Sequence, residues 1–274
     1  MKPKKSLDDS MPELVYSLYY RIANFNIQFN YFQTDIAIID KVKKYTKNIL
    51  SGFEIMNCSN PDITINIKGR FHLDILRKQF PRNYYISFLE KKKNNLFTIY
   101  YDSYHLKNIL KLLLSELVYK HNGLILHGSS VIYKDKAILF LGKSGSGKTT
   151  TLNLLKEKTV PFTDDISIVR LINKEYYVFP SPLDKKVKPR NKNTGKKIAA
   201  NIYFLKKKGG GNIKLAVYNE KVKKNLYESL WRYDCNEIIG KTVKNFMQKF
   251  RFYYLKYNYL DFTSSKLFFI IYSD

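Results

Sequence analysis

The octet from Gly142 to Thr149 reads Gly-Lys-Ser-Gly-Ser-Gly-Lys-Thr and matches the phosphate-binding pattern G-x-x-x-x-G-K-[ST]. The apolar run 137–141 before it predicts a buried strand, and residues 149–158 behind it predict a helix. Glycines in such a loop let successive backbone N–H groups face one point, to which the helix start adds partial positive charge. The sequence predicts that a nucleotide phosphate binds to Gly142, Lys143, Ser144, Gly145, Ser146, Gly147, Lys148, Thr149 and Thr150.

Two adjacent carboxylates, Asp164 and Asp165, follow the loop after a single predicted helix. If the strands on both sides of this helix run parallel, their ends meet at one edge of a sheet, beside the bound phosphates. Neighbouring residues on a strand point to opposite faces, so one carboxylate can hold Mg²⁺ while the other accepts a proton from an incoming hydroxyl. The alternative interpretation is an Asp-Asp turn that caps the following segment.

Three further side chains have expected roles at this site. Lys148 has the reach to contact the β- and γ-phosphates of a nucleotide, and Thr149 would ligate Mg²⁺. We assign Asp165 to the same metal ion and keep both Asp164 and Asp165 as candidates for the catalytic base. His127 lies upstream of the loop in the polar segment 126–130 and is expected to line the site, with a purely structural histidine as the alternative.

Two signatures of other nucleotide-binding proteins are missing from the sequence. It contains neither the Leu-Ser-Gly-Gly-Gln signature of transporter ATPases nor the Asn-Lys-x-Asp motif that recognises guanine. In most ATPases and GTPases with such a loop, the Asp that organises Mg²⁺ also lies much further along the chain than Asp164 does. The sequence therefore disfavours transporter ATPases and GTPases.

The order of these elements resembles the catalytic core of the bacterial HPr kinase/phosphorylase family. A His-Gly pair at 127–128, a strand, the loop, one helix and the Asp pair follow one another within residues 122–170. The resemblance implies a nucleotide domain of the phosphoenolpyruvate-carboxykinase type, in which Lys148 and Thr149 bind phosphate and Mg²⁺. It also implies that one carboxylate of the Asp pair is the general base toward a serine hydroxyl and that His127 lines the same pocket.

Beyond this core, the chain is similar to the shorter HPr-kinase-like proteins associated with peptide modification, including the kinases of lasso-peptide precursors. Those proteins carry a Ser-Pro segment after the Asp pair, matched here by 180–182, and then a strand like 200–205. The downstream Glu-containing signature of true HPr kinase/phosphorylase is absent from this sequence. The resemblance therefore implies a serine kinase, but neither recognition of HPr nor phosphorolysis.

The composition is that of a folded protein without membrane spans. The chain has 274 residues, 45% of them hydrophobic, which suffices for a core in one large or two modest domains. No stretch approaches the roughly 18 apolar residues of a spanning helix, and the first residues lack the apolar core of a signal peptide, so we expect a cytoplasmic protein. Cys58 and Cys235 lie too far apart in sequence to suggest a metal site or a disulfide framework.

The formal net charge of +25 fits three kinds of partner, namely nucleic acid, an anionic surface or an acidic protein. Only eight of the 48 basic residues are Arg, the residue that best recognises bases and phosphates, so an acidic polypeptide is preferred to nucleic acid. Lys185, Lys186, Lys188 and Arg190 are candidates for substrate contacts, with a solvated basic loop as the alternative. Abundant Lys, Asn, Ile and Tyr are also typical of an AT-rich genome, which explains part of the charge.

The hydrophobic pattern divides the chain into three parts. Residues 1–103 predict a β-rich α+β domain, residues 104–122 a connecting helix, and residues 123–274 a nucleotide domain with an α/β fold. Taken together, the fold class is α/β within the nucleotide domain and α+β overall.

Individual elements follow from the same pattern. Alternating residues predict strands in the first domain, at 25–32, 62–67, 84–89 and 96–101. The nucleotide domain is expected to continue with a strand at 200–205, a hairpin through Gly209–Gly211 into 213–217, and helices near 222–230 and 239–250.

These observations favour an ATP-dependent, Mg²⁺-dependent kinase whose expected acceptor is a serine of a peptide or small protein. Two other classes remain open: a nucleotide-binding regulator that hydrolyses ATP slowly or not at all, and a basic nucleic-acid-binding protein. The sequence leaves open the identity of the acceptor, the choice among ATP, GTP and pyrophosphate as donor, and the oligomeric state.

Overall fold

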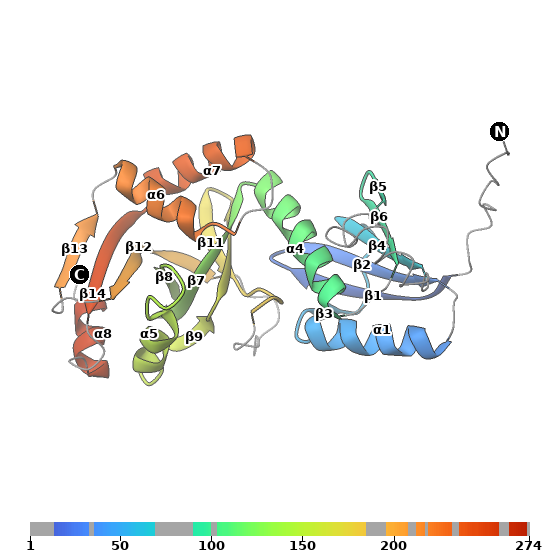
Figure 1. The fold of residues 1–274 in the computed structure, drawn as a ribbon, viewed down its shortest axis with the longest axis horizontal. Helices are drawn as coiled ribbons and strands as arrows, with labels where there is room; N and C mark the ends of the chain where they lie inside the picture. Colours follow the sequence, from blue (N-terminus) through green and yellow to red (C-terminus); the bar gives the residue numbers. More distant parts are fainter. Residues whose placement is uncertain are drawn as a thin grey trace, which may run out of the picture. The chain divides into compact units, whose positions relative to one another are not determined.

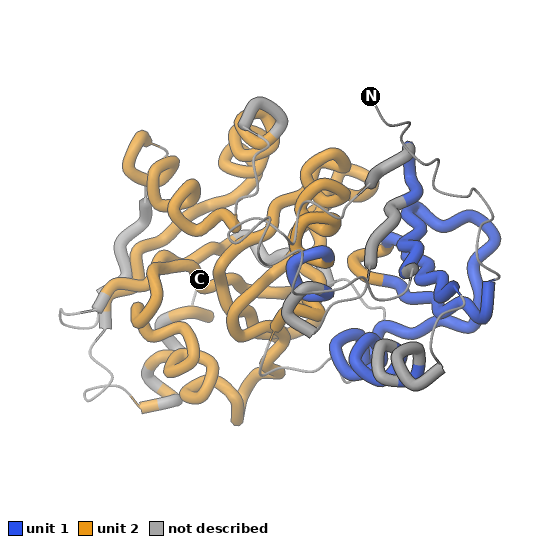
Figure 2. Tube along the Cα trace, turned by 45° about the vertical axis from the view of Figure 1, so that its right-hand side comes forward, with its two compact units in different colours: residues 1–21, 25–109 blue, residues 22–24, 110–274 orange. Residues whose placement is uncertain are grey.

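The computed structural model divides the chain into two compact units, which have different colours in Figure 2. The first contains residues 1–21 and 25–109, and the second contains residues 22–24 and 110–274. Helices and sheets occur together, so the chain is a mixed α and β protein. The structure describes residues 14–32, 36–68, 90–99, 103–184, 196–207, 212–216, 219–231, 236–257 and 263–272.

Alternating side chains build the six-stranded sheet of the first unit. Strand β2 (Phe25–Phe32) buries every second residue from Phe25 to Tyr31, as the sequence predicts. A tight turn joins it to β1, because Ala23 and Asn24 adopt φ of 52° and 62°, which two-residue hairpin turns require. The strands in sheet order are β3 (Glu54–Ile55), β1 (Leu14–Ile22), β2, β4 (Ile63–Lys68), β6 (Asn95–Ile99) and β5 (Glu90–Lys92).

Two helices accompany these strands in the sequence. Helix α1 (Ile36–Ile49) follows β2 and was not predicted. The helix predicted from residue 104 is α4 (Ser103–Lys120), and Asn122 after it adopts a left-handed φ of 56° that Asn tolerates well. The strand predicted at 84–89 lies outside the described residues.

The second unit is built on an eight-stranded sheet with helices on both faces (Figure 1). Helices α6 (Glu220–Ser229) and α7 (Asn236–Lys249) cover one face, and α5 (Lys148–Leu155) and α8 (Ser264–Tyr272) cover the other. Among the described residues, no helix is both long and apolar enough to cross a membrane. The strands in sheet order are β11 (Glu175–Phe179), β10 (Ile166–Ile172), β7 (Gly123–Tyr133), β8 (Lys136–Leu141), β12 (Lys196–Lys207), β14 (Arg251–Tyr257) and β13 (Asn212–Ala216), with β9 (Val160–Thr163) paired to β7.

Strand β12 supplies side chains to two separate cores. Ile202 and Phe204 pack in the core that contains α6 and α7, whereas Tyr203 and Leu205 pack in the core that contains α5 and α8. A strand that is buried on both faces needs apolar residues at consecutive positions, which accounts for the continuous apolar run here. The two cores hold β12 in place beside β8, the strand from which the loop at 142–147 starts.

The predicted hairpin between 200–205 and 213–217 is wrong. Strand β14 lies between the two segments, paired parallel with β12 and antiparallel with β13. The alternation of β14 explains this insertion, because Phe252 faces one core while Tyr253 and Leu255 face the other. A strand with two buried faces is more stable inside the sheet than at its edge.

The strands on either side of α5 do run in the same direction, but they are not neighbours. Both β8 and β9 pair antiparallel with β7, which lies between them. Strand β10 continues along the same edge of β7 as β9, so Asp164 and Asp165 form the junction between two strands that share one partner.

We predict that Leu255→Ala lowers the free energy of unfolding by about 2 to 5 kcal/mol, because a fully buried β14 side chain is removed from the core. Leu14→Ala is the matched control: this leucine at the start of β1 is 49% exposed, and its loss should cost less than about 1 kcal/mol. Urea denaturation of both variants measures the difference. Equal losses would mean that β14 is not an interior strand.

Candidate functional site

The loop between β8 and α5 has the geometry of an anion cradle. Gly147 takes a left-handed φ of 101° at the start of α5, and no side chain caps this helix end. The loop is also tightly closed, because a Cβ atom on Gly142 would lie 2.5 Å from the Oγ atom of Ser146. An uncapped helix start behind a closed glycine loop presents backbone N–H groups and partial positive charge to a ligand.

The ammonium group of Lys148 lies inside this loop. The residue is 7% exposed, and its Nζ atom donates hydrogen bonds to the carbonyl oxygens of Gly142 and Lys143, at 2.8 and 3.2 Å. Burial lowers the pKa of Lys148, while the charges of Asp165 and Asp164 oppose that shift. The lysine is thus held by two carbonyl groups of the loop, within range of the charges of both carboxylates.

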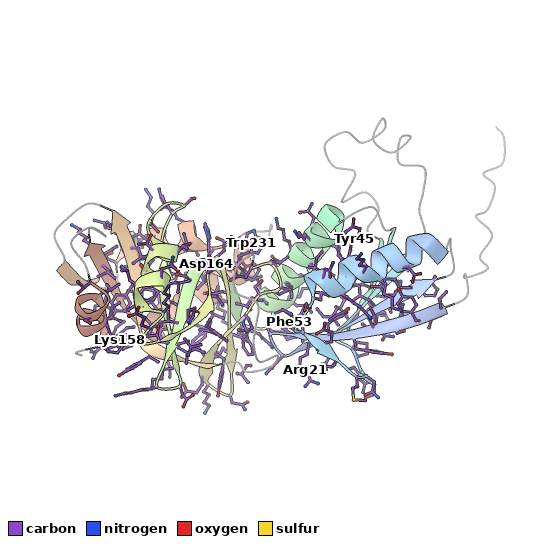
Figure 3. All side chains as sticks on the ribbon, turned by 90° about the horizontal axis from the view of Figure 1, so that it is seen from below. Arg21, Tyr45, Phe53, Lys158, Asp164 and Trp231 are labelled. Atoms are coloured by element: carbon purple, nitrogen blue, oxygen red, sulfur yellow. The ribbon has the colours of Figure 1, made fainter. Side chains whose placement is uncertain are left out.

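The two carboxylates have different neighbours. Asp164 is 4% exposed, and its Oδ1 atom accepts a hydrogen bond of 2.9 Å from the hydroxyl of Thr149 (Figure 3 labels Asp164). The side chain of Asp165 is 45% exposed, and its Oδ1 atom lies 2.7 Å from Nε2 of His127. Asp164 is thus the buried carboxylate, beside α5, and Asp165 is the accessible carboxylate, beside β7.

His127 sits in the middle of β7, opposite the junction of β9 and β10. The backbone N–H of Gly128 donates to the carbonyl oxygen of Asp165 at 3.1 Å, which ties the two segments together at this point. A carboxylate only accepts hydrogen bonds, so His127 donates its Nε2–H to Asp165. The structure therefore brings together Lys148, Thr149, Asp164, Asp165 and His127, the residues to which the sequence analysis assigns roles.

A third carboxylate, Asp184, was missed by the sequence prediction. Its Oδ2 atom accepts the backbone N–H of Asp164 at 2.7 Å and that of Asp165 at 3.3 Å. The turn that precedes it is ordered by the buried Ser181, whose Oγ atom accepts the N–H of Leu183. The Pro-Ser-Pro segment at 180–182 marks this turn, and its signal could have identified the carboxylate that follows.

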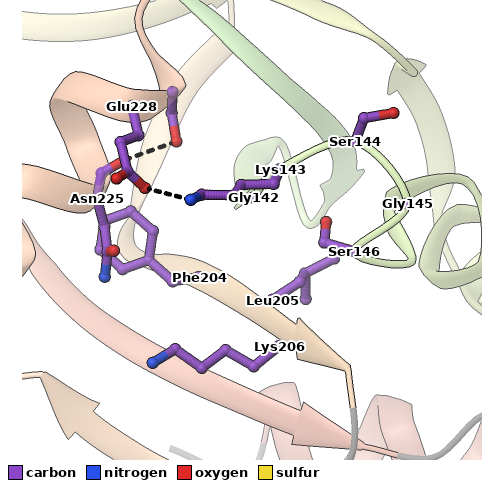
Figure 4. A pocket seen from close by; sticks show the side chains of 11 residues that line it. Gly142, Lys143, Ser144, Gly145, Ser146, Phe204, Leu205, Lys206, Asn225 and Glu228 are labelled. Carbon is purple, nitrogen blue, oxygen red and sulfur yellow. Dashed lines mark hydrogen bonds and ion pairs between the residues drawn. The ribbon is translucent and has the colours of Figure 1, made fainter.

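A pocket of about 370 Å³ lies on the other side of the loop, against β12 and α6 (Figure 4). The side chain of Lys143 crosses toward α6 and forms an ion pair of 3.4 Å with Glu228. Lys206, Asn225 and Ser229 complete the polar lining, and the sequence prediction assigned none of them to the site. The loop contributes Gly142, Lys143, Ser144, Gly145 and Ser146 to this pocket.

The other predicted positions are less informative. Thr150 is half-buried in the first turn of α5. The basic residues Lys185, Lys186, Lys188 and Arg190 lie outside the described part of the chain.

The residues of the loop fit a phosphate group. The Oγ atom of Ser146 is buried and has no hydrogen-bond partner among the described residues, as expected for a donor that awaits a ligand. No group of three or more His, Cys, Asp or Glu that could hold a metal ion occurs within the described ranges. A magnesium site needs only one or two carboxylates together with substrate phosphates, so Thr149 and the Asp pair suffice for it.

Neither a protein-family model nor a curated protein matches this chain.

We predict that Ser146→Ala leaves the free energy of unfolding of the ligand-free protein unchanged or raises it, because the lost hydroxyl is buried and unpaired. Ser130→Ala is the control, since its buried Oγ atom lies 2.7 Å from Oγ1 of Thr163, and its loss should cost about 1 to 3 kcal/mol. Denaturant titrations of the two variants make the comparison. A comparable loss in Ser146→Ala would show that Ser146 has a structural partner.

Proposed function

We propose that this protein is an ATP-dependent kinase that transfers the γ-phosphoryl group to a hydroxyl, with a serine of a peptide or small protein as the acceptor. The observation that carries the proposal is the convergence on one site of the loop hydroxyl of Thr149, the buried Asp164, and Asp165 with His127. A phosphate-binding loop alone suits any nucleotide-binding protein. A loop joined to two carboxylates in different environments suits phosphoryl transfer.

In this proposal the second unit is a P-loop nucleotide domain of the type found in HPr kinases and phosphoenolpyruvate carboxykinases, acting on cytoplasmic ATP. The loop amides, the uncapped start of α5 and the Ser146 hydroxyl bind the phosphate chain. Lys148 exchanges its loop carbonyl partners for phosphate oxygens and stabilises the negative charge of the transition state.

The metal site is formed by Thr149 and Asp164 in this proposal. Their hydrogen bond of 2.9 Å makes Asp164, rather than Asp165, the nearer partner of the threonine hydroxyl. When bound there, Mg²⁺ would neutralise charge on the β- and γ-phosphates. The backbone contacts of Asp184 to both carboxylate residues make Asp184 a positioning residue.

Asp165 is the general base in this proposal, because it is the accessible carboxylate of the pair. His127 binds one of its oxygens and so orients the carboxylate toward the acceptor. The acceptor hydroxyl oxygen forms a bond to the γ-phosphorus as the bond from that phosphorus to the β,γ-bridging oxygen breaks. The bridging oxygen leaves with the electron pair as part of ADP, and the hydroxyl proton passes to Asp165.

The first test of this function is nucleotide binding. Lys148→Ala should weaken the affinity for ATP with Mg²⁺ on the order of a hundredfold, because a desolvated charge contact to the phosphates is lost. Lys158→Ala is the control: Lys158 is a lysine just beyond the opposite end of α5, where it contacts Ser265 and Phe268 (Figure 3). Calorimetric titration measures both affinities. Equal affinities in the two folded variants would remove the phosphate-loop assignment.

The second test separates catalysis from binding. Asp165→Asn should lower ADP formation, with water or serine peptides as acceptor, on the order of 10² to 10⁴ fold, because the amide cannot accept the proton. Its affinity for ATP with Mg²⁺ should stay within about threefold of the parent, since the effect lies in the transition state. Asp135→Asn, in the turn between β7 and β8, is the matched control. Turnover of Asp165→Asn at the parental rate would show that the Asp pair is a structural turn.

A further inference from the structure

Three parallel strands end at the same edge of the second unit's sheet: β8, β12 and β14. The phosphate-binding loop begins directly after β8, where Leu141 is in register with Phe204 of β12. Lys206 lies only two residues further along β12, beside the start of the loop. In open sheets of this kind, ligands bind outside the carboxyl ends of parallel strands.

Lys206 and Lys256 occupy paired positions on neighbouring strands. They are in register in the parallel pairing of β12 with β14, so their side chains start on the same face of the sheet, the face of Phe204 and Tyr254. The side chain of Lys221, on α6, also reaches the Tyr254 ring. The Nζ atoms of Lys206 and Lys221 lie 4.5 and 5.8 Å from the centre of the Tyr254 ring. We call Lys206, Lys221 and Lys256 the lysine cluster.

This arrangement is unfavourable for the protein by itself, because like charges at directly opposite positions of two strands repel each other. Burial lowers the pKa of Lys206, and the charges of Lys221 and Lys256 lower it further. No carboxylate among the described residues forms an ion pair with any member of the cluster. The Tyr254 ring is the one contact partner of Lys206 and Lys221 that the described residues supply, so an anion bound here would add the missing opposite charge and stabilise the cluster.

The cluster reaches from the loop to the surface. Lys206 lines the pocket of about 370 Å³ together with Ser144 and Ser146, and in Figure 4 it extends along the wall opposite Ser144. Lys221 is exposed on α6, outside the set of residues that line the pocket. A ligand that contacts the loop, Lys206 and Lys221 must therefore extend out of the pocket along the surface of α6. An extended polypeptide segment has this shape.

We propose that the lysine cluster binds an acidic segment of the polypeptide acceptor and guides the neighbouring hydroxyl toward the loop. This inference rests on the proposed kinase function and names the chemistry of its acceptor. The phosphates of ATP already have the loop amides, the start of α5 and Lys148 as partners. Nucleic acid is disfavoured as the occupant, because all three cations are lysines rather than the forked guanidinium groups that recognise bases and phosphates best.

The proposal is tested by measuring the affinity of the full chain for a short fluorescent peptide of alternating Glu and Ser residues. The double variant Lys206→Gln/Lys256→Gln should weaken this binding about tenfold, because two partly desolvated charge contacts are lost. Its affinity for ATP with Mg²⁺ should equal that of the parent. Its midpoint of thermal unfolding should not fall, because the substitutions remove a repulsion.

The matched control is Lys223→Gln on the same helix as Lys221. Lys223 already has a partner in Glu220, at 3.3 Å, and its substitution should leave the peptide affinity unchanged. Equal losses in the control and the double variant would indicate a diffuse charge effect and overturn the proposal.

Three further outcomes would also overturn it. One is unchanged peptide affinity in the double variant, and another is a parallel loss of ATP affinity, which would place the cluster in the nucleotide site. The third is tighter binding of a single-stranded oligonucleotide than of the peptide, with the same loss in the double variant. If the parent binds the acidic peptide through the cluster but does not bind ATP with Mg²⁺, the kinase function fails while the acidic-segment site stands.

Discussion

Strand β7 is hydrogen-bonded to β8 along one edge and to β9 and β10 along the other, and the geometry of the site depends on this double pairing. The loop begins after Leu141, which is in register with Gly128, and the N–H of Gly128 binds the carbonyl oxygen of Asp165. The Leu141 side chain packs directly over Gly128, because a Cβ atom there would lie 2.5 Å from Cδ2 of Leu141. Gly128 of β7 thus lies beside both the end of β8, where the loop at 142–149 begins, and the backbone of Asp165.

The sheet order then divides the surroundings of the loop into two chemical environments. On the β7 side lie the carboxylates and His127, which suit metal binding and proton acceptance. On the β12 side lie the pocket and the lysine cluster, which suit an anionic segment. A phosphate chain in the loop would lie between these two environments. The lysine cluster on the β12 side could then hold an acceptor while Asp165 on the β7 side accepts its proton.

The loop and the Asp pair could be predicted from the sequence, and His127 could be named through the family resemblance, whereas the contacts of Asp184 and Lys206 could not be predicted. The loop, the helix after it and the Asp pair form one short stretch whose residue types carry their own signal. Asp184 reaches the Asp pair only through a turn, and Lys206 meets Lys256 only because β14 inserts beside β12. Such pairing depends on which strand fills the interior of the sheet, so the glycines at 209–211 suggested a hairpin that the packing of Phe252 and Leu255 overrides.

In the proposed function, a nucleoside triphosphate binds with its γ-phosphate between the loop and the carboxylates. A crystal structure of the protein with Mg²⁺ and a non-hydrolysable ATP analogue tests this most directly. We expect the phosphates inside the loop formed by residues 142–149, the metal ion beside Thr149 and Asp164, and the γ-phosphate facing Asp165. An analogue bound away from the loop, or one whose γ-phosphate points away from both carboxylates, would rule out the proposed kinase site.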